Sequence, residues 1–565
     1  MRALFYTMIL SAILVVAVIY LRSIPPREPA ITETLDTDST ISLDAELRSM
    51  AVHSQPATLS NIDPNELESV THDALYETGV ELLDLWHLPE AIDVFQTLVS
   101  NDPGNLDAHL RLVECYSHPM VGAERKAEAS WVLASDLAIS TRADTTWVNA
   151  FRSLFLDYMP VKAIVGLTEI VNRGEGNLDA RLLLARSLLM NGDLEGAERY
   201  LGVLLDGDVS LGRARELLIQ SKIARGDVDG AENLAKDLVA LYPEEPYPHV
   251  LLARIKLIQG RLDEATGLCN NALLLDKRYI PAIVSRAHIY VAAGDADAAR
   301  VSFEKLVMFD DPMLASVAAE GIAYVDFLFG NFHAASESMD DAIRFAMGAE
   351  SRRRGMLYAF RFVDYLCELG RVDAAERVLD RWLSRYTEIP TELGELRILI
   401  SQGNLDEARS MLAQLEVDER WQSWMRSLSL DQSELEALAL IHEKDFKRAL
   451  TVLGARAPEP GGTRSAYLTG YALFQNGDAE GAVDSFRRTQ SLIYGVVFPY
   501  HNDPILYVQS IFFLGEAALA RGESEQAQAY YRDFLNHWGN ADWDLKAVDR
   551  ARAKLETLSL RPSDD

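Results

Sequence analysis

The sequence predicts an all-α protein that is built from repeated pairs of helices. The first observation is a regular spacing of alanines that each follow a short polar turn. Intervals of 34 residues separate five of them in succession: Ala163, Ala197, Ala231, Ala265 and Ala299. The second is apolar periodicity, because leucines recur at helical spacing in stretches such as ARLLLARSLLMNG, which starts at Ala180. The third is length, since 565 residues exceed what one hydrophobic core usually holds.

A glycine marks the turn inside each of the regular repeats. Glycine adopts the left-handed backbone that ends a helix, and the polar residue that often follows it caps the next helix. Five residues after the glycine comes the alanine, whose small side chain allows the two helices to approach closely. The repeat-defining residues of the four most regular units are the glycines Gly192, Gly226, Gly260 and Gly294 and the alanines Ala197, Ala231, Ala265 and Ala299.

Thirteen such alanines can be aligned along the chain, and we call them the anchor alanines. Successive anchors are 33 to 45 residues apart. The longer intervals predict inserted loops or extended helices, with possible breaks near residues 345–356, 416–432 and 454–465. The helical array is predicted over residues 71–540, followed by a closing amphipathic helix and tail over 541–565. The anchors are Ala91, Ala127, Ala163, Ala197, Ala231, Ala265, Ala299, Ala335, Ala375, Ala408, Ala449, Ala482 and Ala527.

This pattern resembles the tetratricopeptide repeat (TPR), a helix–turn–helix unit with a period of 34 residues. The resemblance covers most of the chain, from about Thr71 to Trp538. It implies a right-handed superhelical solenoid of about 13 TPR-like repeats, whose concave groove is lined by the first helices. It also implies that other proteins bind in this groove, as extended peptides or as helices. The asparagines of the two-carboxylate clamp in chaperone-tail binders are missing from the matching places.

The resemblance also names candidate binding residues. In TPR units the residue eleven positions before the anchor alanine faces the concave groove. The central repeats place polar and aromatic side chains there, which predicts a binding surface for backbone carbonyls or carboxylates of a peptide. The alternative is that the arginines pair with neighbouring acids and form ordinary surface. The candidate residues are Arg152, Arg186, Gln220, Arg254, His288 and Tyr324.

The N-terminus has a different composition from the repeats. Nineteen residues from Ala3 to Leu21 carry no charge, which is enough for a helix to cross a bilayer core. Residues 1–22 are therefore predicted to be an uncleaved transmembrane signal anchor, because no small-residue cleavage site follows the apolar run. Residues 23–70 are rich in Pro, Ser, Thr and acids, which is typical of a disordered linker. We expect the solenoid to be extracytoplasmic (periplasmic), although the flanking charges are nearly balanced.

Composition and motifs narrow the function. The formal net charge of −31 makes nucleic acid an unlikely partner. No phosphate-binding loop, zinc-protease or hydrolase motif occurs, so we expect no enzyme activity, no cofactor and no metal. His501 and Asp503 are two potential metal ligands without a third. The arginine run 352–354 is interpreted as an exposed helix start, and the three cysteines as buried apolar residues.

These observations predict a non-enzymatic, membrane-anchored scaffold for protein–protein interactions. By analogy with other membrane-tethered TPR proteins, its setting would be envelope assembly, secretion or polysaccharide export. The alternative is a TPR adaptor or regulator that faces the cytoplasm and serves a membrane enzyme complex.

Overall fold

A computed structural model describes most of the predicted solenoid. The described residues are 72–118, 121–173, 178–207, 212–349, 351–383, 391–415, 421, 432–454, 463–491 and 503–559. The predicted anchor and linker, residues 1–22 and 23–70, lie outside this part of the chain. Within it, no helix combines the length and the apolar character that a membrane crossing requires. Thr71–Asp565 form one compact unit.

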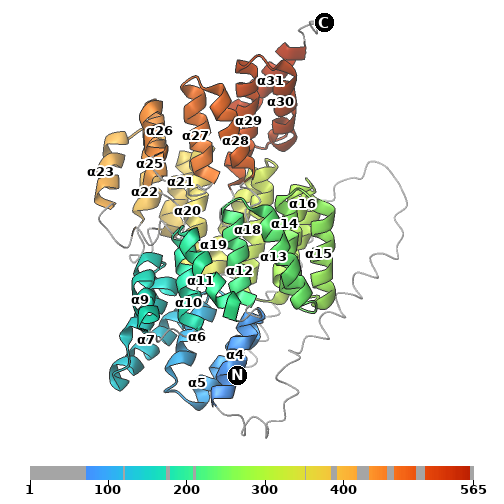
Figure 1. The fold of residues 1–565 in the computed structure, drawn as a ribbon. Coiled ribbons are helices and arrows are strands. Elements are labelled where there is room, and N and C mark those ends of the chain that lie inside the picture. Colours follow the sequence, from blue (N-terminus) through green and yellow to red (C-terminus); the bar gives the residue numbers. More distant parts are fainter. Residues whose placement is uncertain are drawn as a thin grey trace, which may run out of the picture. The chain divides into compact units, whose positions relative to one another are not determined.

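The described part of the chain is helical, and its helices follow one another in pairs (Figure 1). The first helices of the pairs are α4 (His72–Asp84), α6 (Leu106–Tyr116), α8 (Thr145–Phe151, extended by the π-helix η1, Arg152–Leu156), α10 (Leu178–Met190), α12 (Gly212–Ala224), α14 (Pro246–Ile258), α16 (Ile280–Ala292), α18 (Pro312–Leu328), α20 (Arg352–Glu368), α22 (Glu392–Gln402), α25 (Gln432–His442), α27 (Thr463–Gln475) and α29 (Pro504–Ala520).

The second helix of each pair carries one anchor alanine. These helices are α5 (Leu88–Asn101), α7 (Glu124–Thr141), α9 (Pro160–Asn172), α11 (Leu194–Gly207), α13 (Val228–Leu241), α15 (Leu262–Leu275), α17 (Ala296–Glu304, followed by the 3-10 turn η2, Lys305–Phe309), α19 (Phe332–Gly348), α21 (Val372–Val378, followed by the π-helix η3, Leu379–Leu383), α23 (Leu405–Leu415), α26 (Phe446–Gly454), α28 (Ala479–Ser491) and α30 (Ser524–Trp538). A closing helix, α31 (Lys546–Ser559), packs against α30.

The anchor alanines lie in the buried core of the repeats. All thirteen have no exposed surface. The first helix often contributes a glycine where it packs against the second helix. In the first pair this residue is Gly79 of α4, where an added Cβ would lie only 2.6 Å from the Phe95 ring of α5. Phe95 follows Ala91 by four residues, so one turn of α5 supplies both the small and the aromatic half of the contact. A larger side chain at an anchor position would force the two helices apart.

A left-handed residue stands five positions before every anchor alanine. Its φ angle lies between 52° and 91° in all thirteen repeats. The four glycines named above have φ angles of 82°, 80°, 72° and 77°, in chain order. Ten of the thirteen residues are glycine, which adopts this conformation without steric cost. The exceptions are Trp86, Tyr158 and Lys444.

Lys444 offers a direct test of this backbone requirement. Its side chain is exposed, so Lys444→Gly removes backbone strain and little packing. We expect the free energy of unfolding to rise by about 0.5–1 kcal/mol, measured by chemical denaturation. Glu436→Gly, at an exposed position inside α25, is the matched control and should lower it by about 1 kcal/mol. Destabilisation by both variants would contradict the strain argument.

Two helices of the central repeats begin at carboxylates that come from distant repeats. The backbone N–H of Arg353 in α20 donates to Glu124 Oε2 (2.8 Å). The backbone N–H groups of Phe332 and His333 in α19 donate to the two carboxylate oxygens of Asp542 (2.9 and 3.0 Å). The residues before these helices make no side-chain cap bond. The eighth and ninth repeats are therefore held by an early repeat and by the C-terminal segment.

The arginine run was wrongly interpreted as an exposed helix start. Arg354 is only 6% exposed. The Arg353 guanidinium lies over the Tyr158 ring, 4.0 Å from its centroid, and donates to the backbone carbonyl of Leu156 (3.1 Å). The run lies where the third and ninth repeats meet, so its side chains are desolvated by tertiary contacts that have no local signature. Tyr158 is one of the aromatic residues in the left-handed turn position.

Candidate partner-binding face

Buried ion pairs join the first helices of four early repeats. Arg111 on α6 pairs with Glu114 (2.7 Å) and with Asp179 on α10. Arg213 on α12 pairs with Asp84 on α4 (2.5 Å) and with Glu114 (3.3 Å). Burial alone would raise the pKa of Glu114, yet the surrounding arginines hold it below its ordinary value. These ion pairs join first helices, which were expected to line the groove, through their own side chains.

Two of the candidate arginines are paired with acids of their own or of earlier repeats. Arg152 contacts Asp157 (3.3 Å) and Glu128 (3.8 Å), and its guanidinium lies 4.3 Å from the centroid of a tryptophan ring. Arg186 lies 3.8 Å from Glu114 and stacks over Phe155, 5.1 Å from the ring centroid. These contacts match the alternative considered from the sequence, in which the arginines serve surface ion pairs.

Gln220 belongs to a cluster that the sequence did not suggest. Its amide donates to Glu216 Oε1 (3.1 Å), one turn earlier on α12. The same carboxylate accepts hydrogen bonds from the Tyr247 hydroxyl (2.6 Å) and from the indole N–H of Trp86 (2.7 Å). Burial, followed by the Glu216 charge, raises the pKa of Tyr247, so its hydroxyl remains a proton donor. The only sequence signal for this cluster is that Trp86 replaces the usual turn glycine.

Arg254 differs from the other candidate arginines. It lies on α14 and is partly buried, and its Nε donates to Ser285 Oγ on α16 (3.1 Å). Within the described part of the chain it forms no ion pair. A partly buried guanidinium without a carboxylate partner retains planar donors that fit a carboxylate. It is the candidate residue best prepared for a ligand.

His288 on α16 lies near Arg254, and Tyr324 on α18 packs against His288. Ser285 and Tyr324 are buried, so the partly buried Arg254 and His288 are the more accessible members of this cluster. The His288 ring packs edge-on against Phe303 and Tyr324, with centroids 5.5 and 6.2 Å away. Its Nε2 is buried without a hydrogen-bond partner. Burial and then the nearby Arg254 charge lower the pKa of His288 to about 4, so the ring is neutral at pH 7. We call Arg254, Ser285, His288 and Tyr324 the Arg254 face.

The cysteines and Asp503, which the sequence also singled out, are engaged in the fold. All three cysteines are buried and unpaired, and burial raises the pKa of Cys269 to about 12. The described residues contain no cluster suited to a metal ion. His501 lies outside them, whereas Asp503 caps α29 by accepting from the N–H groups of Ile505 and Leu506 (2.9 and 3.0 Å).

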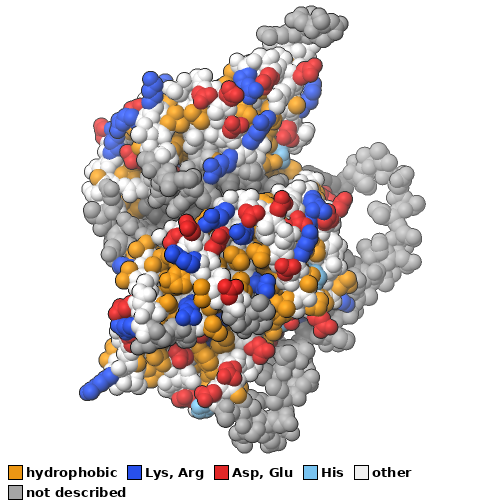
Figure 2. Space-filling view, viewed as in Figure 1, with side chains coloured by type: hydrophobic (Ala, Val, Ile, Leu, Met, Phe, Trp, Pro, Cys, Tyr) orange, Lys and Arg blue, Asp and Glu red, His pale blue; other side chains and the backbone are white. Residues whose placement is uncertain are grey.

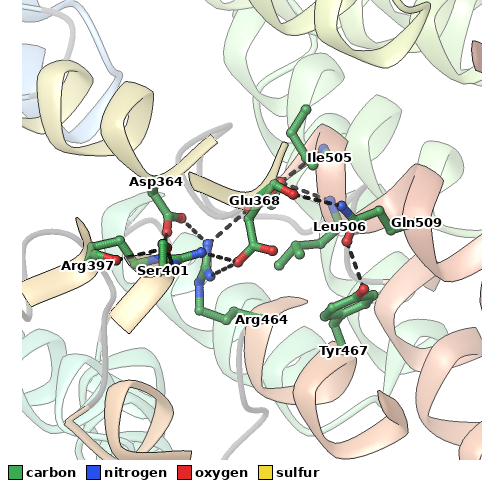
Figure 3. A network of polar contacts seen from close by, with 10 residues as sticks. Asp364, Glu368, Arg397, Ser401, Arg464, Tyr467, Ile505, Leu506 and Gln509 are labelled. Atoms are coloured by element: carbon green, nitrogen blue, oxygen red, sulfur yellow. Dashed lines mark hydrogen bonds and ion pairs between the residues drawn. The ribbon is translucent and has the colours of Figure 1, made fainter. Parts of the chain in front are cut away.

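A second buried charge network joins later repeats (Figure 3). Arg464 on α27 pairs with Asp364 and Glu368 of α20, the latter at 3.1 Å, and with Asp503 at 3.1 Å. Arg397 on α22 contacts the same two α20 carboxylates, at 2.6 and 2.5 Å. Every charged group in Figure 3 is thus satisfied by others, which is typical of a structural joint rather than of a binding site.

A tetratricopeptide repeat model matches residues 217–278, which contain Gln220 and Arg254 and run from α12 to the end of α15. The chain contains tetratricopeptide repeats. A second tetratricopeptide repeat model matches residues 178–201 and 512–532, so the repeats occur in both the early and the last part of the solenoid.

Solved TPR structures are similar to this chain. One is a thermophilic TPR protein of Thermus thermophilus, with 21% identity, a TM-score of 0.27, and coverage of 32% of this chain and 98% of that chain. Another is a TPR protein of Parabacteroides merdae, with 13% identity, a TM-score of 0.24, and coverage of 60% and 96%. No curated protein matches the chain.

Proposed function

We propose that this TPR protein is a non-enzymatic scaffold that binds other proteins through the Arg254 face. TPR proteins generally mediate protein–protein interactions, and repeat arrays present extended binding surfaces. The observation that carries the proposal is the Arg254 guanidinium, which donates to a serine hydroxyl and forms no ion pair with any residue that the structure describes. Natural proteins seldom leave a partly buried charge unpaired unless a ligand completes it.

The side chains of the Arg254 face favour a ligand that presents a carboxylate. A planar guanidinium binds a carboxylate through two parallel hydrogen bonds, and the neutral His288 and Tyr324 rings provide an apolar wall beside it. The net charge of −31 repels strongly acidic proteins. Figure 2 shows basic, acidic and apolar side chains interspersed on the visible surface. The partner is therefore a neutral or basic protein that presents a single carboxylate in an extended segment.

The location of the scaffold is a separate part of the proposal. Residues 1–22 would anchor the chain and residues 23–70 would hold the repeats away from the bilayer, on the extracytoplasmic side. This arrangement suits envelope assembly, secretion or polysaccharide export. Reporter domains fused to the C-terminus, one active only outside and one only inside the cytoplasm, test it. Activity of the cytoplasmic reporter alone would favour the adaptor or regulator of a membrane enzyme complex.

The binding surface is tested by crosslinking and pull-down from intact membranes. We expect Arg254→Ala to reduce partner capture about 10- to 100-fold, the usual loss for a charge-assisted hydrogen bond to a ligand. Arg186→Ala is the matched control, because Arg186 already contacts an acid, and it should keep near-normal capture. Equal capture by wild type and Arg254→Ala would show that the Arg254 face is ordinary surface.

A further inference from the structure

The turn between the first two helices lies against the first helices of later repeats. Trp86 donates its indole N–H to Glu216 on α12, 130 residues away in the sequence. Its ring lies 4.8 Å from the Tyr247 ring of α14, centroid to centroid, and meets the Tyr242 ring edge-on at 6.2 Å. The next residue, His87, hydrogen-bonds through Nε2 to Glu245 (2.8 Å). An aromatic ring and an imidazole therefore occupy a surface made of two carboxylates and two tyrosines.

The surface under this turn is shaped to receive it. A Cβ added to Gly212, the first residue of α12, would lie 2.4 Å from the carbonyl oxygen of Asp84 and 2.8 Å from the Trp86 ring. Only glycine permits this approach, because any side chain would collide with backbone. Arg213 then pairs with the Asp84 carboxylate at 2.5 Å. The contact combines shape, hydrogen bonding and charge, as a recognition site does.

The backbone of Trp86 is strained for the sake of this contact. Trp86 has a φ angle of 62° at a position where ten repeats use glycine. A left-handed conformation is unfavourable for a non-glycine residue, because its Cβ comes too close to the backbone. The turn itself does not require a side chain there, so the aromatic contact with α12 and α14 must offset the strain. Backbone hydrogen bonds, such as that from the His87 N–H to the Leu82 carbonyl (2.8 Å), close the turn within its own repeat. The Trp86 and His87 side chains are held on this surface by their own contacts, so a competitor that takes those contacts can release them.

We propose that the Trp86 turn, residues 85–87, is an internal occupant of a partner-binding surface formed by Glu216, Tyr247 and Glu245. A partner segment with an aromatic residue beside a basic one displaces it. This inference rests on the proposed function, because the surface adjoins the Arg254 face: the Arg254 charge also acts on the Tyr247 hydroxyl. The aromatic ring of the partner replaces Trp86, and its basic side chain faces Glu245 in place of His87.

Tethering explains why such an occupant suppresses binding. A segment of the same chain acts at an effective concentration on the order of millimolar. A free peptide with the same contacts competes poorly, because its apparent Kd rises as the open fraction of the protein falls. Removing the Trp86 side chain frees Glu216 and the Tyr247 ring and removes the strain in the same step. The free peptide should then bind well.

The experiment uses the full chain and a fluorescent peptide with the sequence of residues 82–90, LLDLWHLPE. By fluorescence anisotropy, Trp86→Gly should bind this peptide at least tenfold more tightly than wild type. A peptide with alanine in place of its tryptophan should bind neither protein. Adding Glu216→Ala to Trp86→Gly should abolish the gain, because the indole acceptor is then missing.

Three outcomes separate the inference from alternatives. Equal peptide binding by folded Trp86→Gly and wild type would overturn it and leave the turn as a structural joint. Should Trp86→Gly fail to fold by circular dichroism, Trp86→Phe keeps the packing, loses the bond to Glu216, and should bind the peptide severalfold more tightly than wild type. Arg254→Ala, which tests the proposed function, should leave peptide binding unchanged, so failure of one idea is distinguishable from failure of the other.

Discussion

Arg464→Ala is expected to lower the free energy of unfolding by about 3–5 kcal/mol. The Arg464 side chain is 11% exposed and contacts three carboxylates, on α20 and before α29. Its removal leaves those carboxylates desolvated and close to one another, which costs more than the ion pairs contribute. Chemical denaturation followed by circular dichroism measures the change. Arg344→Ala is the control, because its pair with Asp341 is 58% and 50% exposed and should matter by less than about 1 kcal/mol.

The Arg464→Ala defect should also depend on pH. Burial raises the pKa of Asp503 and of Glu434 to about 7, and Arg464 opposes both shifts. A carboxyl whose pKa is raised in the folded state stabilises the fold when protonated and loses that contribution as pH rises through its folded pKa. Without Arg464 these pKa values rise further. The destabilisation should therefore be larger at pH 8 than at pH 5, and the same loss at both pH values would contradict this account.

Trp538→Ala is expected to cost about 3–5 kcal/mol and to release the last repeat from the central ones. Trp538 is 1% exposed, and its indole N–H donates to the carbonyl of Phe327, 211 residues earlier (3.0 Å). Its ring meets Phe332 edge-on at 5.4 Å. Hydrogen exchange should show faster opening of α18 and α19 as well as of α30.

A second tryptophan serves as a control, because it distinguishes the loss of the contact between the last and the central repeats from the loss of any aromatic ring. Trp131 is only partly buried and contacts its own and the next repeat, with its indole N–H donating to the Val148 carbonyl (3.3 Å). Trp131→Ala should cost about 1–2 kcal/mol and leave exchange in α18 and α19 unchanged. Equal changes of hydrogen exchange in α18 and α19 for the two substitutions would argue against the view that Trp538 holds the last repeat on the central ones.

The sequence by itself determined the local architecture, because helix pairs depend on signals that lie within one repeat. Apolar periodicity and the thirteen anchor alanines predicted the helix pairs, and every anchor is fully buried. The turn glycines predicted the left-handed positions. Even the weaker repeats follow this rule, since Tyr158 and Lys444 adopt the glycine conformation where no glycine exists. A left-handed turn held by neighbouring helices can absorb one unfavourable residue.

Tertiary structure alone decided which groove residues remain available. Arg152, Arg186 and Arg254 each stand eleven positions before an anchor alanine, so the sequence predicted the same role for all three. Only Arg254 forms no ion pair with a carboxylate within the described part of the chain. The acid that meets Arg186 comes from a repeat two units away, outside the spacing that defines a repeat.

The contacts between distant repeats were equally absent from the periodic pattern. Glu124 meets Arg353 across 229 residues, Asp542 meets Phe332 across 210, and Trp86 meets Glu216 across 130. A repeat pattern encodes how each helix pair packs on its neighbours. It carries no information on which residues of distant repeats come into contact. Only the folded chain therefore reveals which surfaces these contacts close and which remain free to bind.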